Sequence, residues 1–462
     1  MKKILLLNPP GDQIYLRDYY RSKVSKAKYF YHPLDLLYLS GRFLKQDFDL
    51  GVIDAIADQL SPNDCLAKIK KISPDIILSL VASSSYYKDI AFLEKLKKEI
   101  SDFILIVTGD IYRELKKQTF TATPFVDAVL LDFSTDDIVR YLKNGRGEKI
   151  NNVIYKFKDK IIVGDEVHGS GEFDAPLPRW DLFHLEKYSF PFIKKRKFAS
   201  ILTDFGCPHK CSFCAINTLG FKLRPLNSVM EELEMLKSLG VNELFVRDQT
   251  FGANRERTIE FCENLIKKDF NFSWTCFSRV DSVDESILAL MKKAGCHTVM
   301  FGIESANNII LESVKKNISL EQARQATDIC HKLKIRTVGT FIIGLPGETR
   351  ESALNTIDFA KSLNLDYASF NIGVPEFGAP FRKEVIAKGW ADKDNLEMDS
   401  TKSRPIWKNQ FLSNEEIWQL HKKAVKSFYL RPKYLLKRLF ALKTMEEIKQ
   451  TTKEAISLIF RS

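Results

Sequence analysis

The 462-residue sequence lacks any unbroken apolar run of about 18 or more residues, the length that a membrane-spanning helix needs. We therefore expect no transmembrane helix. The apolar run at residues 4–7 is also shorter than the core of a signal peptide, which needs about seven residues, so we interpret it as a buried first strand. With 45% hydrophobic and 28% charged residues, the composition is that of a soluble globular protein.

Cysteine is sparse as well, with eight residues in the whole chain, which is too few for a disulfide framework in a protein of this size. A reducing compartment, and hence the cytoplasm, is expected. Three of the cysteines are crowded into eight positions. The others are dispersed without paired spacing, and we interpret them as core residues rather than as a second cluster: Cys65, Cys262, Cys276, Cys296 and Cys330.

Acidic residues are fewer than basic ones, with 59 Asp and Glu against 70 Lys and Arg, which gives a formal net charge of +11. Residues 422–443 contain no acidic side chain and interleave lysine and arginine with aromatic and aliphatic residues. Such a segment could rest on an anionic membrane, meet a phosphorylated substrate, or cover the mouth of a barrel. A lysine-rich solvated surface explains the net charge equally well, and we expect no nucleic-acid partner.

The chain exceeds the roughly 250–300 residues at which single cores stop growing, so two or three domains are expected. In residues 1–150 short apolar strands alternate with amphipathic helices. The strands are predicted at residues 4–7, 50–53, 75–80, 103–107 and 128–131, and the helices at 34–44, 65–72, 88–100 and 135–143. This alternation predicts an α/β doubly wound parallel sheet, which binds ligands at the carboxyl ends of its strands.

Residues 151–196 interrupt that rhythm with a predicted hairpin at residues 154–163 and a linker rich in glycine and proline. Alternation resumes in residues 197–390. Six strands are predicted there, at residues 200–203, 243–246, 273–277, 298–301, 337–343 and 367–372. Six strand–helix units are too few for a closed eight-stranded barrel and predict a partial (β/α)6 barrel. Residues 391–462 are predicted to form a C-terminal helical cap, with helices at 414–428 and 444–460.

The sharpest motif is GCPHKCSFC at residues 206–214, directly after a strand, with Cys207, Cys211 and Cys214 at spacings of four and three. Three close thiolates suit an iron–sulfur cluster that keeps one coordination position open, since a closed site has four ligands. The alternatives are three buried cysteines or a zinc site completed by His209.

The pattern Cys-x-x-x-Cys-x-Phe-Cys after the first strand of a strand–helix repeat resembles the radical S-adenosylmethionine (SAM) superfamily. The resemblance implies that the three cysteines hold a 4Fe–4S cluster whose open iron is chelated by SAM. One electron, from a donor such as flavodoxin or ferredoxin, then cleaves SAM to a 5′-deoxyadenosyl radical. That radical abstracts hydrogen from an unactivated C–H bond, which requires a closed, dry pocket.

The same resemblance implies roles for residues at the strand ends of the barrel. Phe213 would pack by the adenine, Asp248 would meet the SAM amine, and Arg279 would bind the SAM carboxylate. Glu304 would contact the ribose. The segment at 339–348, with Gly344 and Glu348, would back the adenine. Each charged residue taken singly could form only a salt bridge, but their shared location favours a ligand site.

Residues 4–10, 33–39 and 52–55 resemble the cobalamin-binding domain of one branch of this superfamily, and residues 178–183 and 427–432 support the likeness. That branch contains methylases of unactivated carbon and anaerobic porphyrin-ring cyclases. The implied cobalamin-binding residues are Asn8, Pro9, Pro10, Asp54, Ser83, Ser84, Gly109 and Asp110. The chain lacks an Asp-x-His-x-x-Gly motif, and residues 131–136 replace the usual Gly-Glu-x-Glu. A front domain that has lost its cofactor therefore remains an alternative.

The sequence thus favours methylation of an unactivated carbon of a small-molecule or lipid substrate, through a 5′-deoxyadenosyl radical and methylcobalamin. A cyclase, ring-rearranging or oxidative C–H enzyme without net methyl transfer is the second hypothesis, and a non-catalytic cobalamin sensor is the third. A methylthiolating transfer-RNA enzyme is disfavoured, because its front domain needs three further cysteines and this one has only Cys65. Oligomeric state and substrate are not predicted, and peripheral membrane contact is left open.

Overall fold

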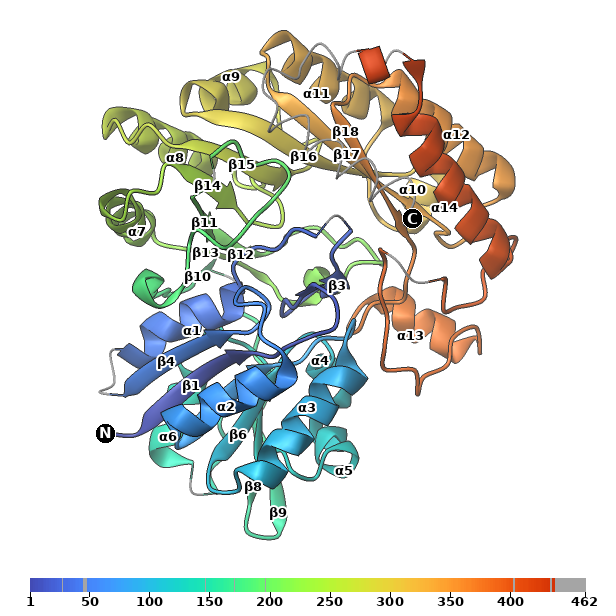
Figure 1. Ribbon diagram of the computed structural model, residues 1–462. Helices are drawn as coiled ribbons and strands as arrows, with labels where there is room; N and C mark the ends of the chain where they lie inside the picture. The colour runs from blue at the N-terminus through green and yellow to red at the C-terminus, as the bar shows by residue number, and fades with distance from the viewer. Residues whose placement is uncertain are drawn as a thin grey trace.

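The computed structural model describes residues 1–26, 28–44, 48–145, 147–169, 171–195, 197–401, 404–432 and 434–436. The chain forms two bodies, each built on a mainly parallel sheet, with the segment between β1 and α1 lying where they meet (Figure 1). The helix expected at 444–460 and the end of the basic stretch at 422–443 lie outside the described residues.

The front body is a seven-stranded sheet in the order β4-β1-β5-β6-β7-β8-β9. Its strands are β1 (Lys3–Asn8), β4 (Asp49–Asp54), β5 (Ile76–Leu80), β6 (Ile104–Thr108), β7 (Ala128–Leu130), β8 (Val153–Phe157) and β9 (Lys160–Val163). The first five run parallel and the last two antiparallel. The expected hairpin therefore extends the front sheet. Because β4 and β5 lie on opposite sides of β1, the topological switch point falls between β1 and β5.

Helices cover both faces of this sheet, which confirms the doubly wound prediction (Figure 1). They are α1 (Leu34–Leu44), α2 (Pro62–Ile72), α3 (Tyr86–Glu99), α4 (Tyr112–Leu115), α5 (Thr119–Ala122) and α6 (Asp137–Asn144). Helix α1 is buried along almost its whole length because it lies against the second body too. Its Tyr38 hydroxyl accepts a hydrogen bond from Leu202 N at 2.8 Å.

The second body is a six-stranded, all-parallel partial barrel in the order β11-β14-β15-β16-β17-β18, as predicted. Its strands are β11 (Phe198–Ile201), β14 (Glu243–Val246), β15 (Ser273–Ser278), β16 (Cys296–Glu304), β17 (Arg336–Ile343) and β18 (Tyr367–Ile372). The helices outside them are α7 (Leu226–Ser238), α8 (Arg255–Lys267), α9 (Glu285–Lys293), α10 (Asn308–Ser313), α11 (Leu320–Lys332) and α12 (Arg350–Ser362).

Several short strands frame the junction and were not predicted. They are β2 (Tyr15–Leu16), β3 (Lys23–Val24), β10 (Gly171–Glu172), β12 (Asp204–Gly206) and β13 (Phe221–Leu223). Strands β2 and β3 form a small antiparallel hairpin, and β12 and β13 bracket the cysteine motif. Elements of two or three residues are too short to show an alternating pattern, so sequence periodicity does not reveal them.

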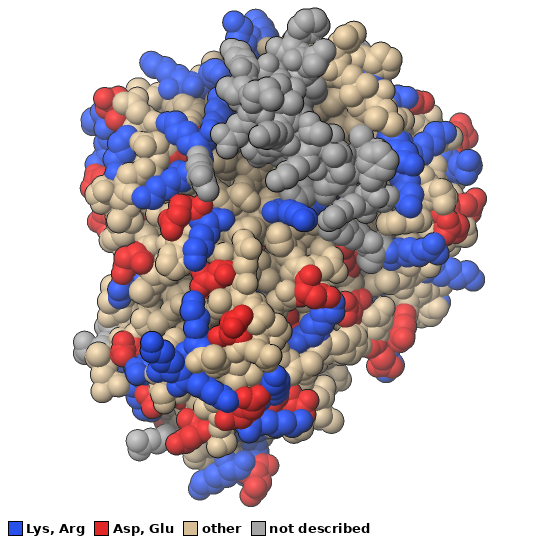
Figure 2. Space-filling model, viewed as in Figure 1, with Lys and Arg blue, Asp and Glu red and all other residues tan. Residues whose placement is uncertain are grey.

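After the barrel, α13 (Pro380–Ala387) is followed by an irregular stretch that returns to the front body, where Met398 N donates to Ser83 O at 3.0 Å. Helix α14 (Asn414–Tyr429) begins with a capping box of Ser413 and Glu416 and packs on β18 and α12 (Figure 1). Within the described ranges, no helix combines the length and apolar character required to cross a membrane. On the face shown in Figure 2, basic and acidic side chains are interspersed.

Candidate active site

The cysteine motif is a loop fixed by backbone hydrogen bonds at both ends. Cys207 N donates to Gly220 O at 3.0 Å, and Ser212 N donates to Val314 O at 2.9 Å. Gly206 starts the loop with a φ of 85°, where a Cβ atom would lie 2.1 Å from Gly220 O, so only glycine fits. The loop thereby turns all three cysteines toward one cavity of about 230 Å³.

This cavity lies at the carboxyl ends of the barrel strands and collects most of the predicted SAM-site side chains. Phe213, Arg279 and Glu304 line it together with the three cysteines. Among the described residues, no three His, Cys, Asp or Glu side chains lie close enough to hold a single metal ion. In a cluster, by contrast, each thiolate binds a different iron atom. Burial raises the pKa of the Cys214 thiol to about 12, so a cation or metal is needed to hold the thiolate there.

Arg279 supplies a positive charge beside this loop. Its Nη1 lies 3.8 Å from Cys211 Sγ, and its Nη2 donates to Lys316 O at 2.8 Å. Asp281 accepts from Arg279 Nε at 2.9 Å and from Nη2 at 2.8 Å. The guanidinium is thus held in one orientation at the cavity wall, where it can stabilise a thiolate or a ligand carboxylate.

Glu304 occupies a strained position at the end of β16. Its φ is 71°, and the pairing of β16 with β17 shifts register between Gly302 and Glu304. A Cβ atom on Gly302 would lie 2.6 Å from Glu304 Oε1, so that glycine makes room for the carboxylate. Lys316 Nζ donates to Glu304 Oε1 at 3.2 Å. Left-handed backbone in a non-glycine residue costs about 1–3 kcal/mol and clusters at functional sites.

Asp248 does not line this cavity, although the sequence placed it in the SAM site. Because strand residues alternate between faces, Arg247 points into the barrel and Asp248 points away. Thr203 N donates to Asp248 Oδ1 at 2.6 Å and Asp204 N donates to the same oxygen at 3.1 Å. Burial raises the pKa of Asp248 to about 6. Asp248 therefore braces the strand that leads into the cysteine loop.

Two residues next to Asp248 reach the cavity instead, and sequence reasoning missed them. Gln249 and Thr250 both line it, and Thr250 Oγ1 lies 3.4 Å from Cys207 Sγ. They lie three and four residues after the end of β14 at Val246, too far for the alternation of the strand to assign a face.

Gly344 and Glu348 also lie away from the cavity lining. Gly344 has a φ of 88° and faces Ile417 of α14, whose Cγ2 would lie 3.0 Å from an added Cβ. Gly344 N donates to Glu348 Oε2, while Glu348 Oε1 is buried without a hydrogen-bond partner in the described part of the chain. These two residues shape the turn after β17.

Glu348→Gln is expected to change how stability depends on pH. Burial raises the pKa of Glu348 from 4.5 to about 8. Between these values the folded chain holds a proton that the unfolded chain has released, so this group makes stability fall as pH rises. At pH 8 the free energy of unfolding of the variant should exceed that of the wild type by about 1 kcal/mol or more, since a pKa difference of one corresponds to about 1.4 kcal/mol. At pH 4.5 the variant should have no such advantage. Urea unfolding at both pH values measures this, and equal differences at both would contradict it.

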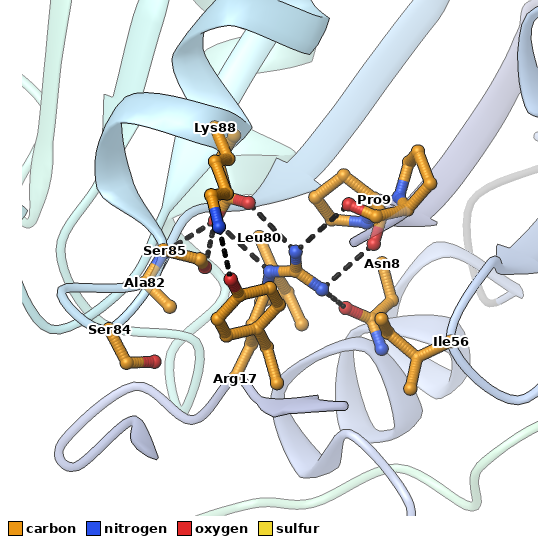
Figure 3. A network of polar contacts seen from close by, with 12 residues as sticks. Asn8, Pro9, Arg17, Ile56, Leu80, Ala82, Ser84, Ser85 and Lys88 are labelled. Atoms are coloured by element: carbon orange, nitrogen blue, oxygen red, sulfur yellow. Dashed lines mark hydrogen bonds and ion pairs between the residues drawn. The ribbon is translucent and has the colours of Figure 1, made fainter. Parts of the chain in front are cut away.

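At the front sheet, the carboxyl ends of β1 and β4 carry the predicted cobalamin residues Asn8, Pro9, Pro10 and Asp54. The Arg17 guanidinium lies at the switch point, between the end of β1 and the loop after β5 (Figure 3). Its Nη1 donates to Asn8 Oδ1 at 2.9 Å and to Pro9 O at 2.8 Å, and its Nη2 donates to Pro10 O at 3.3 Å. Asn8 Nδ2 in turn donates to Asp54 Oδ1 at 2.8 Å. The polar groups at this edge are therefore already paired within the chain.

Asp89 of α3 holds Arg17 in place. Arg17 Nη2 donates to Asp89 Oδ1 at 2.7 Å and Arg17 Nε donates to Oδ2 at 3.0 Å. Both side chains are almost fully buried. Asp89 also accepts hydrogen bonds from Ala82 N at 3.0 Å and from the Ser85 hydroxyl at 2.8 Å. The ion pair thus joins the β2 end of the hairpin to the front sheet.

The second half of this edge, after β5 and β6, is also covered by the hairpin. The hydroxyls of Ser22 and Ser83 both donate to Asp110 Oδ2 at 2.6 Å. Gly109 lets β6 approach β5, because an added Cβ would lie 1.8 Å from Val81 O. Ser84 Oγ is buried and without a hydrogen-bond partner among the described residues.

A small cavity of about 10 Å³ separates this edge from the barrel, and Tyr20 and Arg21 line both it and the cysteine cavity. A space of this size holds about one water molecule and not a corrin ring. A corrin ring at this edge would have to displace the hairpin at residues 15–24, and Ser84, Ser83 and Asp110 would then be available to it.

Comparison with known proteins agrees with this geometry. The sequence profile of the radical SAM superfamily matches residues 201–360. An uncharacterized methyltransferase of Pyrococcus horikoshii is 34% identical over 419 residues, covering 88% of this chain and 90% of that protein. Anaerobic magnesium-protoporphyrin IX monomethyl ester cyclase of Rubrivivax gelatinosus is 29% identical over 360 residues, covering 74% of this chain and 64% of the cyclase.

Two solved structures share the fold at low sequence identity. The cobalamin-dependent SAM radical enzyme OxsB, solved with aqua-cobalamin and SAM bound, has a TM-score of 0.73 and 17% identity, covering 99% of this chain and 72% of OxsB. The radical SAM methyltransferase TsrM of Kitasatospora setae, solved with cobalamin and a [4Fe-4S] cluster, has a TM-score of 0.65 and 18% identity, covering 84% of this chain and 75% of TsrM.

Proposed function

The chain belongs to the radical SAM superfamily, and we propose that it is a cobalamin-dependent enzyme that methylates an unactivated carbon of a small-molecule or lipid substrate. The observation that carries the proposal is the single cavity lined by Cys207, Cys211 and Cys214 together with Arg279 and Glu304. Through Tyr20 and Arg21 this cavity adjoins the strand ends of a doubly wound domain. The methyltransferase of Pyrococcus horikoshii, at 34% identity, supports methyl transfer as the outcome.

The residues around the cavity suit a cluster with SAM on its open iron. The three cysteines would hold the 4Fe–4S cluster, Arg279 would bind the SAM carboxylate, and Glu304 would accept from the ribose hydroxyls. When bound and reduced, this pair of cofactors supplies a 5′-deoxyadenosyl radical. Side chains from the segment between β1 and α1 close the cavity on the side of the front domain and would keep water from that radical, among them Tyr20, Arg21, Tyr29 and Tyr31.

Cobalamin is the proposed second cofactor, bound at the edge that Ser83, Ser84 and Asp110 line. Its binding requires that the β2–β3 hairpin move away from that edge. A one-electron donor such as flavodoxin or ferredoxin is the proposed partner, and the cytoplasm, with peripheral membrane contact left open, is the proposed location.

Cyclisation or oxidative C–H chemistry without methyl transfer is the second candidate, which the cyclase of Rubrivivax gelatinosus supports at 29% identity. A purely sensory role is disfavoured because all three cysteines face the cavity. Protein isolated without oxygen should yield a corrinoid on extraction. With methyl-labelled SAM, label in a new carbon–methyl bond is the expected result. Formation of 5′-deoxyadenosine with an unlabelled product would contradict methylation and support the second candidate.

Glu304→Gln is expected to weaken SAM binding by about 10- to 100-fold, because hydrogen bonds to a charged group are worth about 1.5–3 kcal/mol. Glutamine keeps the size of the side chain and removes the charge. The matched control is Glu312→Gln on α10, which carries an exposed carboxylate. Equilibrium dialysis with labelled SAM on reconstituted protein measures the affinity. Equal affinities for the two variants would contradict the assigned role of Glu304.

A further inference from the structure

The inner wall of the barrel cavity is aromatic and apolar. Phe277 of β15 pairs in register with Met300 of β16, and Met300 with Val338 of β17, so the three form one layer of the barrel interior. Tyr31 and Phe190, from the segments before α1 and before β11, close the same layer. Phe190 stacks on Phe245 at a centroid distance of 4.3 Å. A flat apolar group would find contacts on several sides here.

Arg247 brings a cationic group into this layer. It follows Val246, which pairs with Cys276, so it lies at the level of Phe277. Its guanidinium lies 3.9 Å from the centroid of the Tyr31 ring, and its Nη2 is paired with Asp18. The side chain is 4% exposed, and its Nε and Nη1 have no hydrogen-bond acceptor among the described residues. A buried unpaired donor costs about 1–3 kcal/mol, so these two groups call for an acceptor inside the cavity.

Lys23 of β3 adds a second positive charge to the cavity lining. Within the described part of the chain, no ion pair or hydrogen bond engages its ammonium group. Burial, together with the nearby charges of Arg21 and Arg247, lowers the pKa of Lys23 to about 8, although the carboxylates of Asp18 and Asp399 act in the opposite direction. Arg21 is paired with Glu376 at 2.8 Å and Arg247 with Asp18, and Asp399 is a further carboxylate near Lys23. An anion in the cavity would add a favourable charge interaction with the Lys23 ammonium group.

The anion at Arg247 would differ from the SAM carboxylate. Arg279, which contacts Cys211 and is the proposed carboxylate ligand, directly follows β15 and lies two positions after Phe277. Arg247 is level with Phe277 and therefore lies about 7 Å deeper in the barrel, the rise of two strand residues. Two arginines at two depths suit two separate anionic groups.

We infer that the substrate carries a carboxylate or phosphate on a flat apolar body, with Arg247 and Lys23 binding the anion and the layer of Tyr31, Phe190 and Phe277 binding the body. The inference rests on the proposed function in one respect, because it takes the molecule bound here to be the substrate that the radical attacks. Carboxylate and phosphate share the required chemistry, because both accept hydrogen bonds from a guanidinium at two oxygens.

The test compares matched probes on cluster-reconstituted full-length protein without reductant. We expect 3-phenylpropionate, or phenyl phosphate, to bind at least about tenfold more tightly than 3-phenylpropionamide, as a charge-assisted hydrogen bond of about 1.5–3 kcal/mol implies. Ligand-observed NMR titration measures the affinities, and the tighter of the two anions identifies the head group. Equal affinities for both anions and the amide would overturn the inference.

Arg247→Met should remove this preference and leave SAM affinity unchanged. The exposed Arg255, which pairs with Asp284, provides the control variant Arg255→Met. Since Arg247→Met also breaks a buried ion pair, Lys23→Met is the second variant and should reduce the preference about threefold or more. If Lys23→Met lost affinity for SAM as well as for the anionic probes, and by a similar factor, the inference would be overturned. Lys23 would then belong to the binding site of the SAM carboxylate. If the wild-type protein preferred the anionic probes but did not cleave SAM after reductant was added, the proposed function would be contradicted and the anion site would stand.

Discussion

Cys211→Ala is expected to abolish cluster binding and to lower 5′-deoxyadenosine formation by more than about 100-fold. Mutation of a residue that only orients a metal ligand typically lowers metal affinity or activity about 10- to 100-fold. Loss of a ligand itself should lower them further. Cys211 is the most buried of the three motif cysteines and contacts Arg279, so its removal leaves a cationic wall without a thiolate. Iron content and the visible absorption of anaerobically reconstituted protein measure the first effect.

Cys262→Ala is the matched control because Cys262 is fully buried in α8, away from the cavity. It should lower stability slightly and leave both iron content and 5′-deoxyadenosine formation within about twofold of the wild type, as a core substitution does. If Cys211→Ala retained the full cluster, or if Cys262→Ala lost it equally, the assignment of the motif would be wrong.

Arg17→Met is expected to lower the free energy of unfolding by about 3–5 kcal/mol. Breaking a buried ion pair leaves an uncompensated charge, here on the buried side chain of Asp89 in the first turn of α3. The variant also leaves the carbonyls of Pro9 and Pro10 without their donor. Chemical denaturation monitored by circular dichroism measures the loss.

Lys88→Met is the control, since Lys88 lies beside Arg17 in Figure 3 but pairs with Asp12 on the exposed surface at 2.6 Å. Exposed pairs contribute about 0–1 kcal/mol. Adding Asp89→Asn to Arg17→Met should recover part of the loss. A cost no larger than that of Lys88→Met would show that Arg17 does not hold the hairpin to the sheet.

The architecture followed from the sequence because long, strongly periodic segments dominate it. Helix α1 was predicted with its observed bounds, and both parallel sheets were predicted from continuous apolar strands. The hairpin of β8 and β9 was predicted as well, but its place was not. Its pairing with β7 depends on tertiary packing that local pattern does not encode.

The candidate site was predictable for residues that have a suitable functional group and also lie at the carboxyl end of a predicted barrel strand. Cys207, Cys211, Cys214, Arg279 and Glu304 all reach one cavity, although their ligands remain predictions. The position of Asp248 at the carboxyl end of a strand was predicted correctly, but the side of the barrel wall that it faces was not. A shift of one residue along a strand turns the side chain to the opposite side.

Residues contributed by the hairpin and the segment after it could not be predicted. Arg17, Lys23 and Tyr31 come from a stretch whose strands are only two residues long, and their partners lie far away in the chain. Only the folded structure brings Arg17 to the switch point and Tyr31 against Arg247.

Radical cleavage of SAM by this chain can be measured by chromatographic detection of 5′-deoxyadenosine after the anaerobically reconstituted full-length protein is incubated with SAM and dithionite. The wild-type protein is predicted to form 5′-deoxyadenosine, and Cys211→Ala is predicted to form none above background. A wild-type protein that holds its cluster and binds SAM, yet forms no 5′-deoxyadenosine on reduction, would contradict the account.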